Sequence, residues 1–264
     1  MWPPVKVAIV DSGVATHADL APFLGAGMPT SGITHTRDDE DHGTMLAGTI
    51  CGITNNVKTS SSAAHVQILP IKCCGHQNPP SADAGAEAIN IALKNAAKVI
   101  VLSWGCGYSN TALDTAISNA EKDGAVIVAA AGNWAMDNDL HKSWPASYGT
   151  RNHVITVMAT DRHGNAASFS NWGHESVFIA APGVDILSTV PYCGSLSAGS
   201  AVPVGYRLHS GSSAATAIVA GAVALLLAKN PSFSPLQVKN ALQASAMHSS
   251  SLVGLCKTAG VVQY

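Results

Sequence analysis

Charged side chains are scarce in this chain. Only 11% of its 264 residues are Asp, Glu, Lys or Arg, and the formal net charge is −2. Nucleic acids and acidic membrane surfaces are bound through an excess of basic residues, so we predict neither as a partner. The longest continuous apolar run, Ala217–Ala228, is shorter than the roughly 20 residues that a bilayer span needs.

The six cysteines form no recognisable metal or redox motif. No pair has C-x-x-C spacing, and no Cys and His stand at the spacing of zinc ligands. We expect the adjacent Cys73 and Cys74 to face opposite sides of a strand. Six free thiols fit a reducing compartment, and no basic start precedes an apolar stretch at the N-terminus. The sequence leaves the location open and favours an intracellular one over a secreted one, with removal of a signal or pro-segment as the alternative.

Short apolar runs rich in β-branched residues alternate along the chain with helical patterns. We expect strands over Val5–Val10, Val66–Cys73, Val99–Leu102, Ala125–Ala131, Val154–Ala159 and Val177–Ala180. We expect helices over His42–Gly52, Ala82–Ala97, Thr111–Asp123, Ala214–Ala228 and from Ser234 to about Ala246. This alternation predicts an α/β fold, a mostly parallel twisted sheet with helices on both faces. Since no linker interrupts it, residues 1–264 are expected to form a single domain.

Polar side chains stand where apolar packing does not need them. Asp11, Ser103 and Asn133 follow strands, whereas His42 and Ser213 begin helices. In open α/β sheets functional groups gather at such ends. Nucleophilic catalysis needs a hydroxyl, a base, a carboxylate that orients the base and donors for the oxyanion, and these residues include all four. Taken singly, each also fits a turn or a helix cap.

Four extended segments, in order, carry a family resemblance. They are Val7–Leu20 (VAIVDSGVATHADL), Asp41–Thr49 (DHGTMLAGT), Val128–Asn133 (VAAAGN) and Gly211–Gly221 (GSSAATAIVAG). They resemble the aspartate, histidine, oxyanion-asparagine and serine segments of the subtilisin-like serine proteases, and the resemblance runs from about residue 5 to 246. The chain order Asp, His, Ser is also that of subtilisin among unrelated triads.

The resemblance implies a role for each of four residues. Ser213 would attack the scissile carbonyl, His42 would take its proton and Asp11 would orient the imidazole. Asn133 would donate its side-chain N–H to the oxyanion beside the backbone N–H of Ser213. Ser212 is the competing nucleophile, and the Gly-x-Ser spacing favours Ser213. Two family residues of the serine motif, Pro and His, are replaced here by Ala217 and Ile218, which removes no catalytic group.

The resemblance also implies a peptide or protein substrate bound as an added strand. The residues that would contact it are Ser103, Trp104 and Gly105 on one side and Ala130, Ala131 and Gly132, the opposite wall of the first pocket, on the other. Trp104 stands where the family usually has Leu, so we expect it to reshape a pocket upstream of the cleaved bond. Family members are often made with an inhibitory pro-segment, so a pro-segment or a larger parent protein is a further possible partner.

No cofactor is required by this chemistry. Family members often bind structural calcium, but Thr54–Val57 resembles the usual calcium loop only loosely, so calcium is compatible with the sequence and not predicted from it. The acidic run Asp38–Asp41 is interpreted as a solvated loop, with cation binding or a preference for basic substrate residues as the alternatives.

The leading hypothesis is a serine endopeptidase that works through an acyl-enzyme. One alternative is a peptide-processing or macrocyclising relative, in which an amine instead of water resolves the acyl-enzyme. The other is a catalytically silent peptide-binding module on the same fold. Labelling by a fluorophosphonate separates the module from the two enzymes, and the mass of the products separates hydrolysis from transfer.

Overall fold

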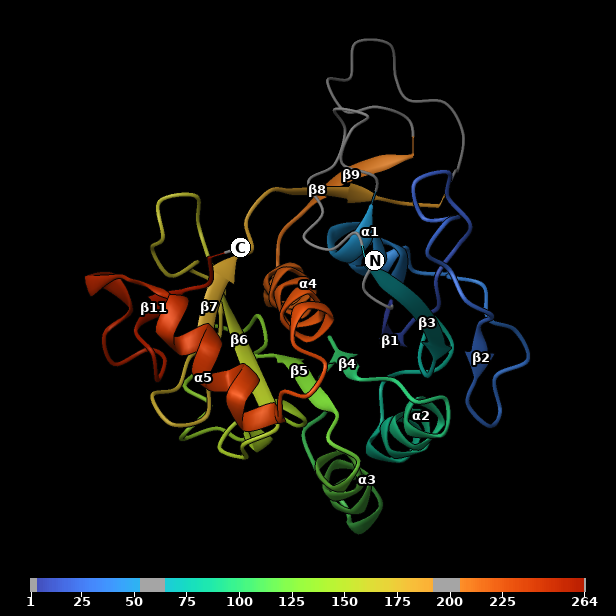
Figure 1. The fold of residues 1–264 in the computed structure, drawn as a ribbon, viewed down its shortest axis with the longest axis horizontal. Coiled ribbons are helices and arrows are strands. Elements are labelled where there is room, and N and C mark those ends of the chain that lie inside the picture. Colours follow the sequence, from blue (N-terminus) through green and yellow to red (C-terminus); the bar gives the residue numbers. More distant parts are fainter. Residues whose placement is uncertain (1–3, 53–64, 192–204, 264) are drawn as a thin grey trace.

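A nine-stranded sheet runs through the molecule (Figure 1). The structure is a computed structural model that describes residues 4–52, 65–191 and 205–263. The strand order is β10-β11-β7-β6-β5-β4-β1-β3-β2, and every neighbouring pair is parallel except β10 and β11. The strands are β1 (Val5–Asp11), β2 (Met28–Pro29), β3 (Val66–Lys72), β4 (Val99–Leu102), β5 (Val126–Ala130), β6 (Val154–Thr160), β7 (Ile179–Pro182), β10 (Met247–His248) and β11 (Gly260–Val261). The predicted mostly parallel sheet is confirmed.

Helices cover both faces of this sheet (Figure 1). They are α1 (His42–Cys51), α2 (Ala82–Lys94), α3 (Thr111–Lys122), α4 (Ser212–Lys229) and α5 (Pro235–Ser245). Within the described residues, two short 3₁₀ helices span Ala146–Tyr148 and Ser250–Leu252. Helices α2, α3 and α5 each begin after a capping residue. The side chains of Ser81, Asn110 and Ser234 each accept a hydrogen bond from a backbone N–H of the first turn.

The two faces of the sheet bury alternate residues of each strand. On β1, Val7 and Ile9 pack in the core beneath α1 and α4, whereas Ala8 and Val10 pack with residues of α2 and α3. Because both faces are covered, the central strands are mostly apolar instead of alternating with polar residues. Burial on both faces explains why the central strands can be recognised in the sequence as continuous apolar runs.

Helix α4 lies at the centre of the fold. By length and composition it could cross a bilayer, but 83% of it is buried inside the protein. It packs against β1, β4, β5, β6 and β7 and against α1. It is therefore a core helix, and its second residue, Ser213, lies at the start of a helix that these five strands hold in place.

Three features depart from the sequence predictions or lie beyond them. Strands β8 (Ile186–Thr189) and β9 (Tyr206–His209) form a separate antiparallel pair that the sequence did not suggest. The expectation for Cys73 and Cys74 is wrong: both thiols pack in one apolar cluster, because β3 ends at Lys72 and the alternation of a strand ends with it. Cys193 and Thr54–Val57 lie outside the described residues.

Candidate active site

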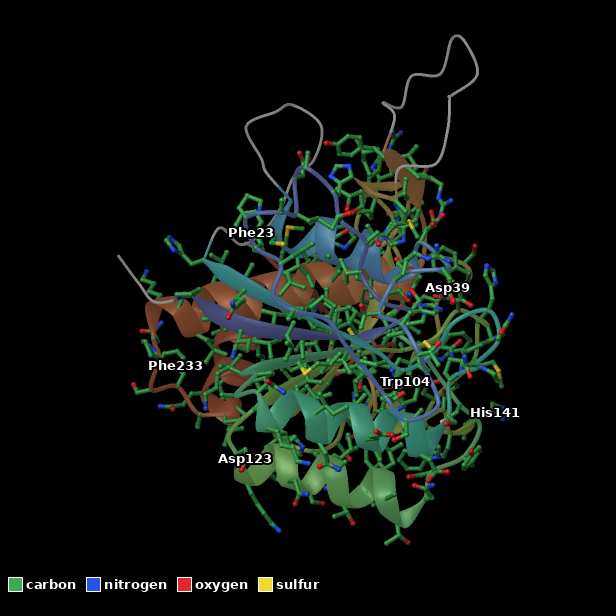
Figure 2. The ribbon with its side chains drawn as sticks, turned by 90° about the vertical axis from the view of Figure 1, so that its right-hand side faces the viewer. Phe23, Asp39, Trp104, Asp123, His141 and Phe233 are labelled. Atoms are coloured by element: carbon green, nitrogen blue, oxygen red, sulfur yellow. The ribbon has the colours of Figure 1, made fainter. Side chains whose placement is uncertain are left out.

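The predicted site residues gather at the carboxyl edge of the sheet. Asp11 ends β1, Ser103 follows β4 and Asn133 lies just beyond β5, while His42 begins α1 and Ser213 lies in the first turn of α4. Parallel strands β4, β1 and β3 bring their carboxyl ends to the same edge. Figure 2 shows Asp39 and Trp104 at this end of the molecule and Phe233 at the other.

Asp11 and His42 form a hydrogen-bonded pair. The Nδ1 atom of His42 lies 2.8 Å from Oδ1 of Asp11, and the same oxygen accepts the backbone N–H of Ser12 at 2.8 Å. The Asp11 side chain is 2% exposed and that of His42 is 30% exposed. Gly43 makes this approach possible, since a Cβ there would collide with the carbonyl oxygen of Gly13. The predicted orientation of the imidazole by Asp11 has the geometry that it needs.

Ser213 is buried at the beginning of α4. Its hydroxyl donates to the carbonyl oxygen of Ser103 at 3.3 Å, which ties α4 to the end of β4. Free backbone N–H groups and the helix dipole favour negative charge at this helix end. Within the described part of the chain the hydroxyl makes no hydrogen bond to His42, so proton transfer between Ser213 and His42 stays a prediction.

Asn133 is bound to the same helix end. Its side-chain oxygen accepts the backbone N–H of Ser212 at 2.8 Å, and its Nδ2 lies beside Gly211. The hydroxyl of Ser212 in turn accepts the backbone N–H of Gly132 at 3.0 Å. Ser212 is fully buried and engaged, so it is a poor nucleophile here, and Ser213 remains the candidate.

The predicted walls of the first pocket differ in how they use their side chains. The ring of Trp104 is buried against α2, where a Cβ on Gly85 would collide with it. The large ring of Trp104 therefore fits against α2 because residue 85 of that helix is a glycine. On the other wall Gly132 has φ +113°, a conformation that favours glycine, and a Cβ there would lie 2.5 Å from Nδ2 of Asn171.

Trp134 is a residue that the sequence analysis missed. Its side chain is 62% exposed, yet a Cβ on Gly105 would lie 3.7 Å from its Cη2 and one on Gly132 would lie 2.9 Å from its Cζ3. The ring therefore contacts one glycine from each predicted wall. Its position directly after Asn133 was the available signal, but the contact with Gly105 depends on the folded chain.

The family of this chain follows from its similarity to known proteins. A family model described as the subtilase family matches residues 4–260, almost the whole chain. The chain belongs to the subtilase family. This membership makes it a subtilisin-like serine protease, and hence a hydrolase.

Relatives of known name agree with this subtilase assignment. Subtilisin Savinase from Lederbergia lenta is 36% identical over 252 residues, which cover 95% of this chain and 87% of that protein. An alkaline protease from Alkalihalobacillus alcalophilus is also 36% identical over 252 residues, but the chain spans only 61% of its length. Among solved structures, a lanthipeptide protease has a TM-score of 0.84 at 25% identity and covers 99% of this chain and 86% of its own.

The charges around His42 of this subtilase favour its protonated form. Burial of the ring acts to lower the pKa of His42, but the carboxylates of Asp11, Asp38 and Glu40 outweigh burial, so the pKa is raised above 6.5. His209 on β9 responds in the opposite direction. Burial, the charge of His42 and the charge of Arg207 lower its pKa to about 4, so it is neutral at neutral pH.

A pH profile of the subtilase should show this shift. Since His42 must be neutral to accept a proton, we expect kcat/KM to rise with pH and to reach half of its plateau above 6.5, the ordinary imidazole value. The measurement is kcat/KM for a neutral peptide substrate from about pH 5 to pH 9. An acid limb centred below the ordinary imidazole pKa would contradict the prediction.

Part of the acidic run before His42 is buried, whereas the sequence suggested a solvated loop. Asp38 is 5% exposed, because its carboxylate is enclosed by hydrogen bonds from α1 and from the end of β1. Asp39 is partly buried and pairs with the fully buried Lys72 at 2.6 Å. The interpretation was wrong for Asp38, since charge alone does not indicate whether a carboxylate is enclosed by donors.

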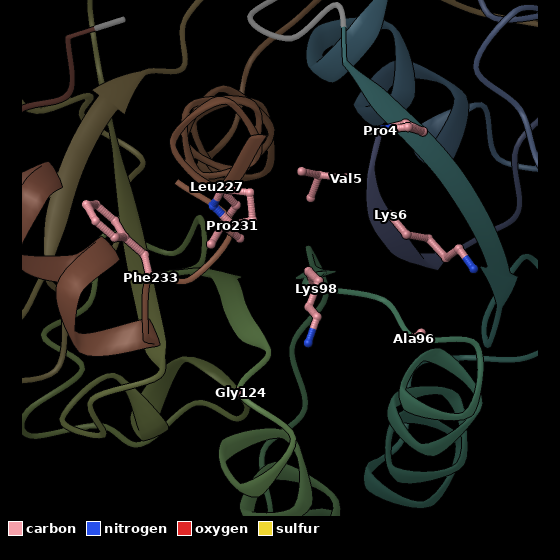
Figure 3. Close-up of a pocket in the computed structure, with 9 residues that line it drawn as sticks. All are labelled: Pro4, Val5, Lys6, Ala96, Lys98, Gly124, Leu227, Pro231 and Phe233. Atoms are coloured by element: carbon pink, nitrogen blue, oxygen red, sulfur yellow. The ribbon is translucent and has the colours of Figure 1, made fainter. Parts of the chain in front are cut away.

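Metal binding and the remaining pockets add little to the site of the subtilase. In the described ranges, no three His, Cys, Asp or Glu side chains come together as metal ligands. One pocket at the opposite edge of the sheet is lined by residues that include Lys6, Lys98, Leu227 and Phe233 (Figure 3). It lies beside the amino end of β1, far from Asp11 at the carboxyl end of that strand, and takes no part in the site.

Proposed function

We propose that this subtilase is an endopeptidase that cleaves extended peptide or protein substrates through an acyl-enzyme on Ser213. As Ser213 Oγ attacks the scissile carbonyl carbon, its proton passes to Nε2 of His42. His42 then gives this proton to the leaving amine as the C–N bond breaks. A water molecule, deprotonated by His42, finally attacks the ester, and His42 returns the proton to Ser213 Oγ as the acid product leaves. The scheme needs no cofactor.

The negative charge that develops on the carbonyl oxygen needs donors already in place. The backbone N–H of Ser213 and the side-chain amide of Asn133 would supply them. Asn133 suits this role because its oxygen is engaged by Ser212 N–H, which leaves its Nδ2 donors on the other side of the amide. Residues 103–105 and 130–132 would hold the substrate backbone on either side.

The observation that carries the proposal is the 2.8 Å pair of Asp11 and His42, at the same edge of the sheet as the buried helix start that bears Ser213. A fluorophosphonate provides the test, because it reacts with a serine only when that serine is activated. We expect covalent labelling at Ser213, loss of labelling in Ser213→Ala and normal labelling in Ser210→Ala. Ser210 is a suitable control, since it is exposed and bonded to Asp185. A folded protein that is not labelled would instead be a peptide-binding module.

The structural relative named as a lanthipeptide protease favours a second candidate, the processing of a peptide precursor. The same triad would serve it, and an amine within the substrate could replace water to give a transferred or cyclic product. Mass spectrometry of the products decides between them, because hydrolysis adds the mass of water to the sum of the fragments and transfer does not.

Trp134 is expected to restrict the side chain immediately before the cleaved bond. In Trp134→Ala the ring no longer lies against Gly105 and Gly132, so large side chains should gain relative to alanine by about 10-fold or more in kcat/KM. A peptide library that varies this position measures the ratio. Leu140→Ala, which truncates another exposed apolar residue of the same loop, is the matched control. Identical side-chain preferences at this position for wild type and Trp134→Ala would show that Trp134 does not line the pocket.

A further inference from the structure

A second carboxylate, that of Asp38, lies buried against the segments that carry Asp11 and His42. Asp38 accepts four hydrogen bonds, more than its position in a loop would suggest. Its Oδ1 accepts Ser12 Oγ at 2.8 Å and Glu40 N at 3.1 Å, and its Oδ2 accepts the backbone N and Oγ1 of Thr44 at 2.8 and 2.5 Å. Both oxygens are thus saturated by donors, as a buried charge requires.

Three of these four donor groups, Ser12 Oγ and the backbone N and Oγ1 of Thr44, belong to the segments that carry the catalytic pair. Ser12 directly follows Asp11, and its hydroxyl also accepts the backbone N–H of Gly43 at 3.0 Å. Gly43 directly follows His42, and Thr44 lies in the same first turn of α1. A single carboxylate therefore connects the end of β1 to the beginning of α1.

Lys72 holds the same segment from another side. Its ammonium group, 1% exposed, donates to the carbonyl oxygen of Ser12 at 2.5 Å and to Oδ1 of Asp39 at 2.6 Å. Ser12 is therefore fixed through its hydroxyl by Asp38 and through its carbonyl by Lys72. The chain on which Asp11 sits has little freedom to move relative to α1.

We propose that Asp38 is a positioning residue of the proteolytic site, whose carboxylate fixes His42 in the orientation that Asp11 and Ser213 require. The inference rests on the proposed function of this site. Asp38 does not touch the reacting atoms and acts through Ser12, Gly43 and Thr44. Since a displacement of about 1 Å can cost 10²-fold in rate, loss of this connection has a large effect on turnover.

The charge of Asp38 also acts on His42 directly. Among the residues that the structure describes, four titratable groups face this imidazole: Asp11 from β1, Asp38 and Glu40 from the loop before α1, and His209 from β9. Arg207, also on β9, is hydrogen-bonded to Asp41. The carboxylates raise the pKa of His42 and His209 is neutral. Removal of one carboxylate charge therefore moves the acid limb of the pH profile to lower pH.

Asp38→Asn and Asp41→Asn form a matched pair of variants. Each removes one negative charge from the loop before His42, but among the described residues the Asp41 side chain is hydrogen-bonded only to the exposed Arg207, and it does not cap α1. For Asp38→Asn we expect the plateau kcat to fall on the order of 10- to 100-fold with little change in KM. We also expect its acid limb to shift to lower pH. For Asp41→Asn we expect a plateau kcat within about twofold of wild type.

A second readout does not depend on turnover. The imidazole protons of His42 are titrated by NMR in the Ser213→Ala background, with His42→Gln to assign them, and Asp38→Asn is expected to lower the pKa of His42. If the wild type does not hydrolyse peptides but this shift is seen, the proposed function fails and the connection between Asp38 and His42 stands. A wild-type plateau kcat and a wild-type His42 titration in Asp38→Asn would overturn the inference.

Should Asp38→Asn not fold, as judged by thermal unfolding, Ser12→Ala tests the same connection more gently. It removes only the hydroxyl that joins Asp38 to Gly43 N–H. We expect a fall in kcat of about 10-fold without a matching rise in KM. A folded Ser12→Ala protein with wild-type kcat would overturn the inference as well.

Discussion

Replacement of Ser213 or His42 by Ala is expected to lower kcat for peptide hydrolysis by about 10⁶-fold, the loss found for the same replacements in subtilisin. The physical reason is that the hydroxyl is a weak nucleophile without the imidazole, and the imidazole has nothing to deprotonate without the hydroxyl. The two groups act as one unit, so the double variant should be no worse than either single variant.

The measurement is kcat under substrate saturation, with thermal unfolding to show that each variant folds. Ser210→Ala is the control for Ser213→Ala, since it makes the same chemical change three residues earlier in an exposed position. His141→Ala is the control for His42→Ala, because His141 lies in an exposed loop at the same end of the molecule (Figure 2). A His42→Ala protein with near-normal turnover would show that another group is the base.

Asp11→Asn has the second largest expected effect, a fall in kcat of about 10⁴-fold. The carboxylate accepts Nδ1–H of His42 at 2.8 Å and thereby leaves Nε2 free as the base. An amide at this position can present its NH₂ group to Nδ1, which places the proton on Nε2 and removes the base. The substituted side chain also no longer stabilises the imidazolium that forms during the transfer.

The same variant should not lose stability. Oδ2 of Asp11 is buried and accepts no hydrogen bond from any residue that the structure describes, so the native site encloses an incompletely compensated charge. We expect an unfolding temperature at or above that of wild type together with the large loss of kcat. A marked fall in unfolding temperature would show that Asp11 stabilises the fold, and a kcat within about 10-fold of wild type would remove it from the triad.

The central strands and main helices were predictable because their sequence signals are local. Strand β1 is apolar on both faces, since α1 and α4 cover one face and α2 and α3 the other. Helix α5 begins at a Ser-Pro pair that caps and then opens it. The polar strand ends at Asp11, Ser103 and Asn133 were likewise visible, since they interrupt runs that packing alone would keep apolar.

Other features depend on contacts between distant segments and carried no local signal. Strands β8 and β9 are four residues each and partly exposed, so neither has a distinctive pattern. The burial of Asp38 depends on donors from Ser12 and Thr44, which reach it only after β1 and α1 have packed together. Trp134 meets Gly105 for a similar reason, since the two residues lie in the loops that follow β5 and β4, and these strands come together only in the sheet.

The position of α4 has a consequence for how the protein can be renatured. Helix α4 comes late in the sequence, and Ser213 reaches its place in the site only when α4 has packed against β1 and β4 to β7. A chain therefore gains activity after most of it has already collapsed. In a mixture, the first molecules to mature would digest those still unfolded, which makes recovery fall as protein concentration rises. The yield of wild-type protein refolded from denaturant should therefore be compared with the yield of Ser213→Ala, which cannot digest other chains.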